Sequence, residues 1–263
     1  MSVIKLVSKA MERIAPLKGP PLQHRNSRNV LLTIDLTPQV LKEAIALPAA
    51  AIIAYHPPLF KPLSSLTLAN PLQASLLWCA TAGISIYSPH TALDSVYGGI
   101  NDWLADGLGE GKVELLHGET VPSLGGGGRL VCLDEKVSFK VLQERVKKYL
   151  GLTHLQVAQA PTRLHNDVQT IAICAGSGGS VLQGIKADVY LTGEMSHHEV
   201  LAAVAADRSV ILCGHSNTER GYLPILANRL REEFSKLDGE GWALAKEISF
   251  HVSDKDADPL ITV

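Results

Sequence analysis

Short apolar runs alternate with amphipathic segments along most of the chain, and this alternation predicts repeated βαβ units. In the first half the pattern predicts strands at 29–34, 50–54 and 84–87, and helices at 37–47, 71–82 and 100–108. Thr37 and Pro38 are typical of a helix start, because Thr caps free backbone N–H groups and Pro fits the first helical position. Gly83 is typical of a helix end.

The second half repeats the scheme. Its pattern predicts strands at 130–133, 155–158, 169–174, 188–191, 210–213 and 248–252, and helices at 139–149, from 180 onwards, at 196–206 and at 218–234. Glycine occupies every position from 125 to 128, which predicts a flexible break between the halves. We therefore predict an α/β fold of two similar α/β lobes, 1–124 and 125–263, with mixed, mostly parallel sheets.

The chain before residue 29 is basic, with six Lys or Arg residues against the single acidic residue Glu12. Apolar residues recur there at helical spacing, which predicts an amphipathic first helix ending near Pro16. These apolar residues are Val3, Ile4, Val7, Met11 and Ile14. A transit peptide explains the same stretch, and the sequence leaves both interpretations open.

Composition narrows the class of protein. The net charge is −2 over 263 residues, so no strong field favours nucleic acid, and no apolar run reaches the roughly 18 residues of a membrane span. No two of the cysteines Cys79, Cys132, Cys174 and Cys213 have CxxC spacing, which favours buried free thiols over disulfides or zinc ligands. Free thiols favour a reducing compartment. We therefore expect a cytoplasmic protein, with the nucleus and the mitochondrion as alternatives.

Polar residues with metal-ligand chemistry follow three of the predicted strands. His56 follows the strand at 50–54, His90 and Asp94 follow the strand at 84–87, and His215 and Glu219 follow the strand at 210–213. Because the carboxyl ends of parallel strands meet at one edge of a sheet, residues far apart in sequence can converge there.

The spacing and types of these residues suit a pair of divalent ions. His90 and Asp94 are four residues apart, as are His215 and Glu219, so each pair shares one face of a helical turn. Imidazole binds borderline metals, and carboxylates bridge ions or bind harder ones. Each pair alone is more typical of a helix cap or a solvated polar pair than of a metal site. Their recurrence after separate strands puts the metal interpretation on an equal footing.

Two further segments carry both functional and structural interpretations. His198 follows the strand at 188–191 and could act in chemistry, but Ser196 and Glu199 are also typical of a capping box on an ordinary helix. The glycine-rich turn at 175–180 could hold a phosphate at a helix N-terminus. It lacks the third glycine of a dinucleotide site and the lysine of a P-loop, so tight strand–helix packing is favoured.

Five segments together resemble the motifs of one family. They read IAYHPPLF at 53–60, YSPHTA at 87–92, CAGSG at 174–178, YLTGEMSHH at 190–198 and GHSNTERG at 214–221. On these residues the chain resembles the Nif-three-like family, also known as the NGG-interacting factor three or GTP cyclohydrolase I type 2 family, and is most similar to its eukaryotic branch.

The resemblance implies a dinuclear metal centre between the two lobes, at the carboxyl ends of the strands. Its ligands would be His56, Asp94, His215 and Glu219, with His90 close by, and zinc, manganese or iron all suit such a set. It also implies a ring-shaped homo-oligomer, for example a hexamer, and a protein partner linked to transcription. It implies neither direct nucleic-acid binding nor membrane attachment.

Two departures from the family pattern concern the site and the fold. Tyr55 stands where many bacterial members have a second His, which predicts that one metal position is weaker. The family's Trp-Asp-Asn-x-Gly-Leu segment is replaced by KGPPLQHRNSR at 18–28, whose prolines predict a loop where the family has a strand.

Two functions from different classes remain open. The first is a metal-dependent hydrolase of a small nucleotide-like molecule, in which Glu194, His198 or His90 would act as general acid or base. The second is a non-enzymatic regulatory or scaffold protein that interacts with transcription factors. A turnover assay with a Glu219→Ala control separates the two.

Overall fold

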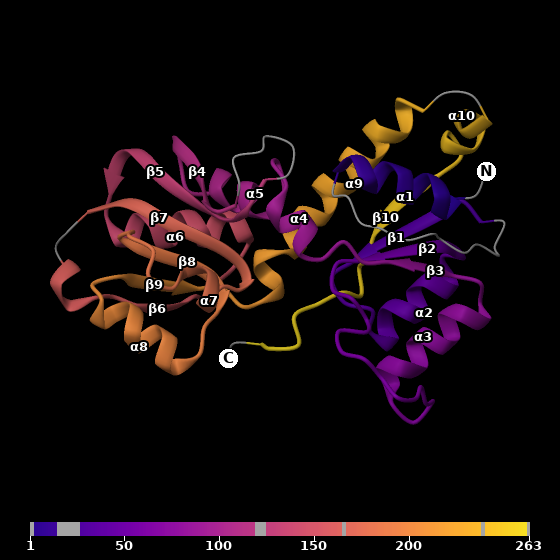
Figure 1. Cartoon of the computed structure of the whole chain (residues 1–263), viewed down its shortest axis with the longest axis horizontal. Helices are drawn as coiled ribbons and strands as arrows, with labels where there is room; N and C mark the ends of the chain where they lie inside the picture. Colours follow the sequence, from indigo (N-terminus) through magenta and orange to yellow (C-terminus); the bar gives the residue numbers. More distant parts are fainter. Residues whose placement is uncertain (1–2, 15–26, 119–124, 165–166, 238–239, 262–263) are drawn as a thin grey trace. The chain divides into compact units, whose positions relative to one another are not determined.

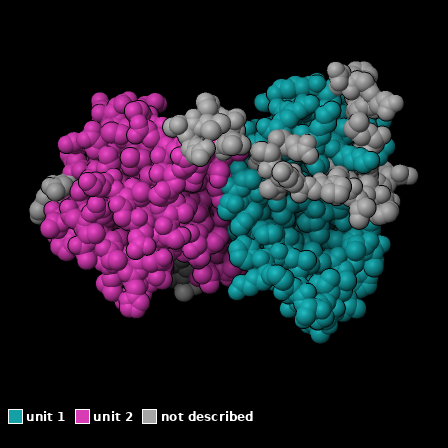
Figure 2. Space-filling model, viewed as in Figure 1, with its two compact units in different colours: residues 1–93, 223–257 teal, residues 94–222, 258–263 magenta. Residues whose placement is uncertain are grey.

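The computed structural model describes residues 3–14, 27–118, 125–164, 167–237 and 240–261, so most of the predicted loop at 18–28 lies outside the described residues. The chain forms two compact units, coloured separately in Figure 2. Unit 1 contains Met1–Leu93 and Leu223–Ala257, and unit 2 contains Asp94–Tyr222 and Asp258–Val263. These bounds differ from the predicted lobes 1–124 and 125–263, because the chain returns to the first sheet near its end.

Unit 1 is built on a four-stranded parallel sheet with the order β10-β1-β2-β3 (Figure 1). The strands are β1 (Asn29–Thr33), β2 (Ala49–Ala54), β3 (Ser85–Tyr87) and β10 (Ser249–Val252). All four were predicted within one or two residues of these bounds. Every residue of β2 is buried, as expected for a central strand covered on both faces.

Helices cover both faces of this sheet. They are α1 (Val3–Ile14), α2 (Pro38–Ala46), α3 (Pro71–Thr81), α9 (Leu223–Ser235) and the unpredicted α10 (Glu240–Ala245). In Figure 1, α2 and α3 lie on one face and α1 and α9 on the other. The predicted start of α2 is confirmed: the Thr37 side chain accepts from the Val40 amide, and Pro38 occupies the first helical position. The predicted amphipathic first helix is also confirmed, with Val3, Val7 and Met11 fully buried.

The core of unit 1 joins α2 and α3 to the sheet. Leu31 of β1 and Ile52 of β2 pack in one cluster with Val40 of α2 and Cys79 of α3. These side chains come from alternate strand positions and from one stripe of each helix, which is the pattern that the periodicity predicts.

Unit 2 is built on a six-stranded mixed sheet with the order β4-β5-β7-β8-β9-β6. The strands are β4 (Gly111–His117), β5 (Gly127–Val137), β6 (Gln156–Ala158), β7 (Val168–Ser177), β8 (Val189–Glu194) and β9 (Ser209–Leu212). The central strands β7, β8 and β9 run parallel, and the outer pairings are antiparallel. β4 was not predicted, because this edge strand is mostly exposed and has no buried run of its own.

Apart from α6, the helical segments of unit 2 are short. They are α5 (Ile100–Asp106), α6 (Phe139–Leu150), α7 (Gly179–Leu182), α8 (His197–Ala205) and the 3₁₀ turns η1 (Pro161–Arg163), η2 (Ser216–Thr218) and η3 (Arg220–Tyr222); α4 (Thr91–Ser95) leads into the unit. Leu182 of α7 and Ala203 of α8 pack in one cluster with Tyr190 of β8 and Val210 of β9. None of the helices among the described residues has the length and apolar character needed to cross a membrane.

The helix predicted at 218–234 is present as α9, but its predicted start was wrong. The helix begins only at Leu223, since two 3₁₀ turns of unit 2 replace its predicted first part. Gly221 packs so closely on Trp103 that a Cβ there would overlap the indole ring, and the Tyr222 hydroxyl donates to the Gly98 carbonyl at 2.7 Å. These contacts hold the turns in a non-α-helical path.

The predicted flexible break at 125–128 was wrong as well. Gly127 and Gly128 begin β5, and the Gly126 amide donates to the Ser95 carbonyl at 2.9 Å. A side chain at Gly125 would overlap the same carbonyl, and the residue has a φ of 66°. The glycines therefore allow a close backbone approach.

Candidate metal centre

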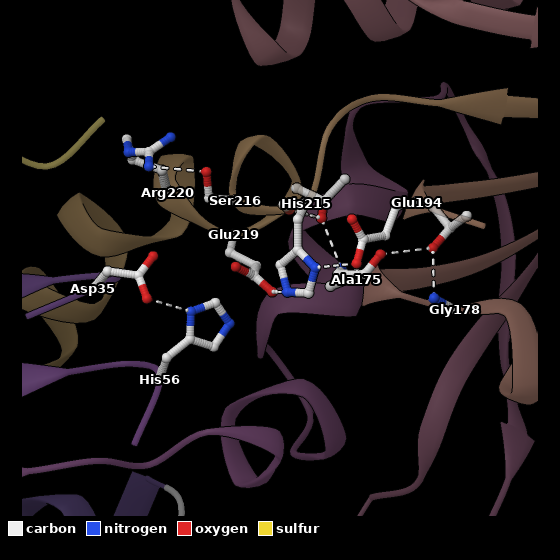
Figure 3. Close-up of polar contacts among 12 residues, drawn as sticks. Asp35, His56, Ala175, Gly178, Glu194, His215, Ser216, Glu219 and Arg220 are labelled. Atoms are coloured by element: carbon white, nitrogen blue, oxygen red, sulfur yellow. Dashed lines mark hydrogen bonds and ion pairs between the residues drawn. The ribbon is translucent and has the colours of Figure 1, made fainter. Parts of the chain in front are cut away.

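In unit 1, the ends of two neighbouring parallel strands bring an imidazole and a carboxylate together. The amides of Tyr55 and His56 continue the β1–β2 hydrogen bonds beyond the strands, to the Thr33 and Ile34 carbonyls. His56 Nδ1 lies 3.0 Å from Oδ1 of Asp35, which lies two residues after the end of β1 (Figure 3). When Nδ1 carries the proton, this contact orients the ring so that Nε2 is the nitrogen suited to bind a metal. Sequence reasoning missed Asp35, although it too follows a predicted strand.

His90 lies beside His56 in the same unit. The centroid of the His90 ring is 5.8 Å from that of His56 and 5.7 Å from that of Tyr55. The His90 amide donates to the Tyr55 carbonyl at 3.0 Å, and the residue has a φ of 46° just before α4. Tyr55 itself is buried. Unit 1 therefore gathers His56, His90 and Tyr55 into one cluster.

In unit 2, His215 and Glu219 face each other across the turn η2. His215 Nε2 lies 3.4 Å from Glu219 Oε1, and the Glu219 side chain is almost fully buried. Two donors that bind one tetrahedral ion through bonds of about 2.0–2.1 Å lie about 3.3 Å apart. The observed separation therefore suits two ligands of one ion, although a 3₁₀ turn rather than an α-helix creates it.

Glu194 contacts the other nitrogen of the same ring. Its Oε1, at the end of β8, lies 2.9 Å from His215 Nδ1, so that the imidazole stands between Glu194 and Glu219 (Figure 3). A carboxylate on the outer nitrogen of a metal-binding His fixes its tautomer and makes it a stronger donor. This contact gives Glu194 the geometry of a residue that orients His215.

The two carboxylates act strongly on the His215 proton. The hydrogen bonds that the protonated ring donates to Glu219 and to Glu194 outweigh partial burial and raise the pKa of His215 to about 9. At neutral pH the metal-free ring is therefore protonated and holds both carboxylates. A metal ion must displace this proton, because only the neutral ring can bind it.

Asp94 approaches the same region of unit 2. It is half-buried in α4, and its backbone carbonyl accepts from Asn101 Nδ2 at 3.1 Å. Burial, followed by the charges of Asp94 and Glu219, raises the pKa of the Cys174 thiol to about 12. The carboxylates of Asp94 and Glu219 therefore both lie near enough to the Cys174 thiol to raise its pKa. The prediction of free thiols is confirmed for all four cysteines, of which Cys79 and Cys213 are buried.

The two other segments singled out in the sequence, around His198 and at the glycine-rich turn, make contacts that support the structural interpretation. The capping box of Ser196 and Glu199 is confirmed. His198 is exposed in the first turn of α8, with its ring centroid 5.4 Å from that of His197, and among the described contacts none joins it to His215 or Glu219. Within the glycine-rich turn the backbone of Gly176 packs closely on Glu219, since a Cβ at Gly176 would lie 2.8 Å from Glu219 Oε1.

The fold and these side chains define an α/β protein with a possible metal-binding group. Among the residues that the structure describes, His215 and Glu219 are the members of this group that lie within unit 2. The model of the Duf34/NIF3 (NGG1p interacting factor 3) family matches residues 22–249, and the chain belongs to this family. The resemblance seen in the sequence is thereby confirmed.

Several relatives are eukaryotic. The protein NIF3 homolog of Schizosaccharomyces pombe is 44% identical over 251 residues, covering 92% of this chain and 87% of that protein. NIF3-like protein 1 of Drosophila melanogaster is 40% identical, covering 92% and 80%. The solved Bacillus cereus protein related to NIF3 has a TM-score of 0.82 at 20% identity, covering 99% of this chain and 98% of that one. At this identity the likeness shows the fold, with its two sheets.

Proposed function

We propose that the protein binds divalent metal ions through His56, Asp94, His215 and Glu219. The observation that carries the proposal is the position of His215, whose Nε2 faces buried Glu219 at the spacing of two ligands while Nδ1 rests on Glu194. His56 has the same outer contact, from Nδ1 to Asp35. In each case the carboxylate on Nδ1 would orient the imidazole for an ion bound at Nε2.

The chemistry of the donor set fits borderline divalent ions. Neutral imidazoles and carboxylates together suit zinc, manganese or iron, and two such ions share the set. Tyr55 provides a neutral phenol where a second imidazole would bind more strongly, so the two positions differ in affinity.

The reaction class that this site supports best is hydrolysis of a small nucleotide-like molecule. Bound divalent ions supply Lewis acidity and lower the pKa of a water molecule. Among this chain's own residues, His90 is the group beside His56 that is suited to carry a proton to or from a substrate. Glu194 orients His215, and His198 is a second proton-carrying candidate on the exposed start of α8.

A regulatory or scaffold role is the second candidate, and one feature of unit 1 favours it. Large apolar side chains are exposed along the segment after His56 and on α3: Leu59, Phe60, Leu63, Leu66, Leu68, Leu72 and Trp78. Clustered exposed apolar residues are typical of protein-binding surfaces. The same surface suits the proposed homo-oligomeric ring, and sedimentation of the purified protein tests that assembly.

Metal content tests the binding proposal directly. Elemental analysis after loading and dialysis should find divalent metal in the unaltered protein and little in His215→Ala or Asp94→Ala. His154→Ala is the matched control, since it removes an exposed imidazole elsewhere. Equal metal in all four proteins would refute the assignment.

Turnover decides between the two functions. The metal-loaded protein is screened against nucleotides, phosphoesters and cyclic amides beside Glu219→Ala. Hydrolysis that depends on Glu219 supports the enzyme, and its absence across the screen favours the scaffold.

A further inference from the structure

A chain of buried hydrogen bonds in unit 2 begins at Asn101, in the first turn of α5. Its side chain is 1% exposed. Nδ2 donates to the Asp94 carbonyl at 3.1 Å, and Oδ1 accepts from the Ala175 amide at 2.9 Å. The orientation of the amide group is settled by chemistry, because a flipped group would face donor to donor and acceptor to acceptor. Asn101 thus ties the backbone of a proposed ligand to the end of β7.

The next residue of β7 continues the chain to Thr218. The Gly176 amide donates to Thr218 Oγ1 at 2.8 Å, and Oγ1 donates in turn to the His215 carbonyl at 2.7 Å. Thr218 is fully buried. Gly176 also lies against the ligand side chains themselves, since a Cβ there would be 3.0 Å from His215 Nε2. The turn at the end of β7 is therefore in contact with both proposed ligands of η2.

These bonds join the backbone of Asp94 to that of His215 without a gap. Asn101 and Thr218 use the polar atoms of their side chains on backbone groups of the ligand segments, so they act through other residues and are not ligands. Metal ligands must be held within about 0.5 Å of their working geometry, which their own rotamers cannot ensure alone. Buried networks in which every bond is made are rigid, because each broken bond leaves a buried polar group unpaired.

We infer that Asn101 and Thr218 are positioning residues that set the geometry of the Asp94, His215 and Glu219 side of the metal centre. The inference rests on the proposed metal binding. Sequence patterns do not reveal it: Asn101 looks like an ordinary first-turn helix residue, and Thr218 lies one residue from Glu219 without ligand chemistry of its own.

The test measures Co²⁺ binding to the full chain by titration and by the d–d absorption spectrum, which reports coordination geometry. Asn101→Ala removes both hydrogen bonds of the amide, and Thr218→Val removes the hydroxyl while keeping the shape. Each should weaken Co²⁺ binding by about 10–100-fold, as loss of outer contacts does in other metal sites, and change the spectrum. Thr218→Ser retains the hydroxyl and should restore both affinity and spectrum.

Ser209→Ala is the matched control. Ser209 is a buried residue of the same sheet, 3% exposed, whose Oγ accepts from the Ala160 amide at 3.2 Å. It should lower the melting temperature of the metal-free protein and leave the Co²⁺ affinity and spectrum unchanged. If Ser209→Ala weakens Co²⁺ binding as much as Thr218→Val does, the effect is one of general stability and the inference is wrong.

The design separates failure of the inference from failure of the proposed function. If the unaltered protein binds no Co²⁺, or if Asp94→Ala and His215→Ala bind it equally well, the metal site itself is wrong. If those two variants lose Co²⁺ while Asn101→Ala and Thr218→Val bind it normally, only the positioning role is overturned. Should Asn101→Ala fail to fold, the comparison of Thr218→Val with Thr218→Ser decides.

Discussion

In both units a carboxylate contacts the Nδ1 atom of a histidine, but the surroundings of the two imidazoles differ. In unit 1, Asp35 follows β1 and orients His56, which follows the neighbouring parallel strand β2. In unit 2, Glu194 ends β8 and orients His215, which follows the neighbouring parallel strand β9. A carboxylate and an imidazole at the ends of adjacent parallel strands therefore recur in sheets of different topology.

The difference lies in the carboxylates that contact the two imidazoles. His215 has a second carboxylate on Nε2, Glu219, whose side chain is only 2% exposed, whereas Asp35, which contacts Nδ1 of His56, is 46% exposed. The buried carboxylate is held by a packed turn and adds a negative charge at low dielectric, so in the proposed site unit 2 would supply the more preorganised ligands. The comparison teaches that strand ends supply oriented imidazoles in both units, and we expect the tightness of metal binding to depend on the buried carboxylate beside His215.

The largest expected effect comes from removing ligands in unit 2. His215→Ala and Glu219→Gln should each lose more metal affinity than the roughly 100-fold upper range of outer-contact losses. His56→Ala should lose less, because unit 2 still supplies Asp94, His215 and Glu219. Calorimetric titration with Zn²⁺ measures all three. A larger loss in His56→Ala than in His215→Ala would reverse the comparison.

The second effect concerns the outer carboxylates. Glu194→Gln and Asp35→Asn each replace an orienting carboxylate by a neutral amide of the same shape. Both should weaken metal binding by about 10–100-fold, because the imidazole becomes a poorer and less well-oriented donor. Equal losses would show that the carboxylate–imidazole contact contributes equally to metal binding in the two units. If Asp35→Asn binds metal as the unaltered protein does, the contact in unit 1 is incidental.

A gain of affinity is expected at Tyr55. Tyr55→His adds an imidazole beside His56 and His90 and should tighten the weaker metal position by about tenfold, a change within the range that single contacts around metal ligands produce. Calorimetry should resolve one tight and one weak position in the unaltered protein. Tyr55→Phe is the control, since it keeps the ring and adds no ligand. Two equally tight positions before substitution would contradict this prediction.

A pH dependence is expected for unit 2. The pKa of His215 is raised from 6.5 to about 9, chiefly by Glu219 and then by Glu194. The protonated ring therefore stabilises the metal-free protein fully below about pH 6.5, and this contribution is lost as the pH rises toward 9. Metal affinity should move the opposite way and increase with pH, because the ion competes with that proton.

Denaturant unfolding of the metal-free protein across this pH range tests the effect, with His215→Gln as the variant that lacks the proton. The unaltered protein should lose stability relative to His215→Gln as the pH rises. Parallel pH profiles for the two proteins would mean that the proton does not couple to folding.

The sequence by itself determined the elements whose causes are local. The cap at Thr37 and Pro38, the stripe of apolar residues in α1 and the runs that form β1, β2, β8 and β9 all depend on near neighbours, and the structure has them where the pattern predicts. The placement of His56 and His215 directly after strands also follows from local order along the chain, so both could be selected as candidates from the sequence.

Tertiary structure decided the partners. Asp35 and Glu194 meet their histidines only because β1 lies beside β2 and β8 beside β9, and strand order is not encoded in the periodicity of any single strand. The return of α9 and β10 to unit 1 and the 3₁₀ turns before Leu223 likewise depend on contacts between distant segments. Asn101 and Thr218 carry no signal in sequence for the same physical reason: each makes its hydrogen bonds to backbone groups, which every residue presents alike, so only the folded chain shows which backbone they hold.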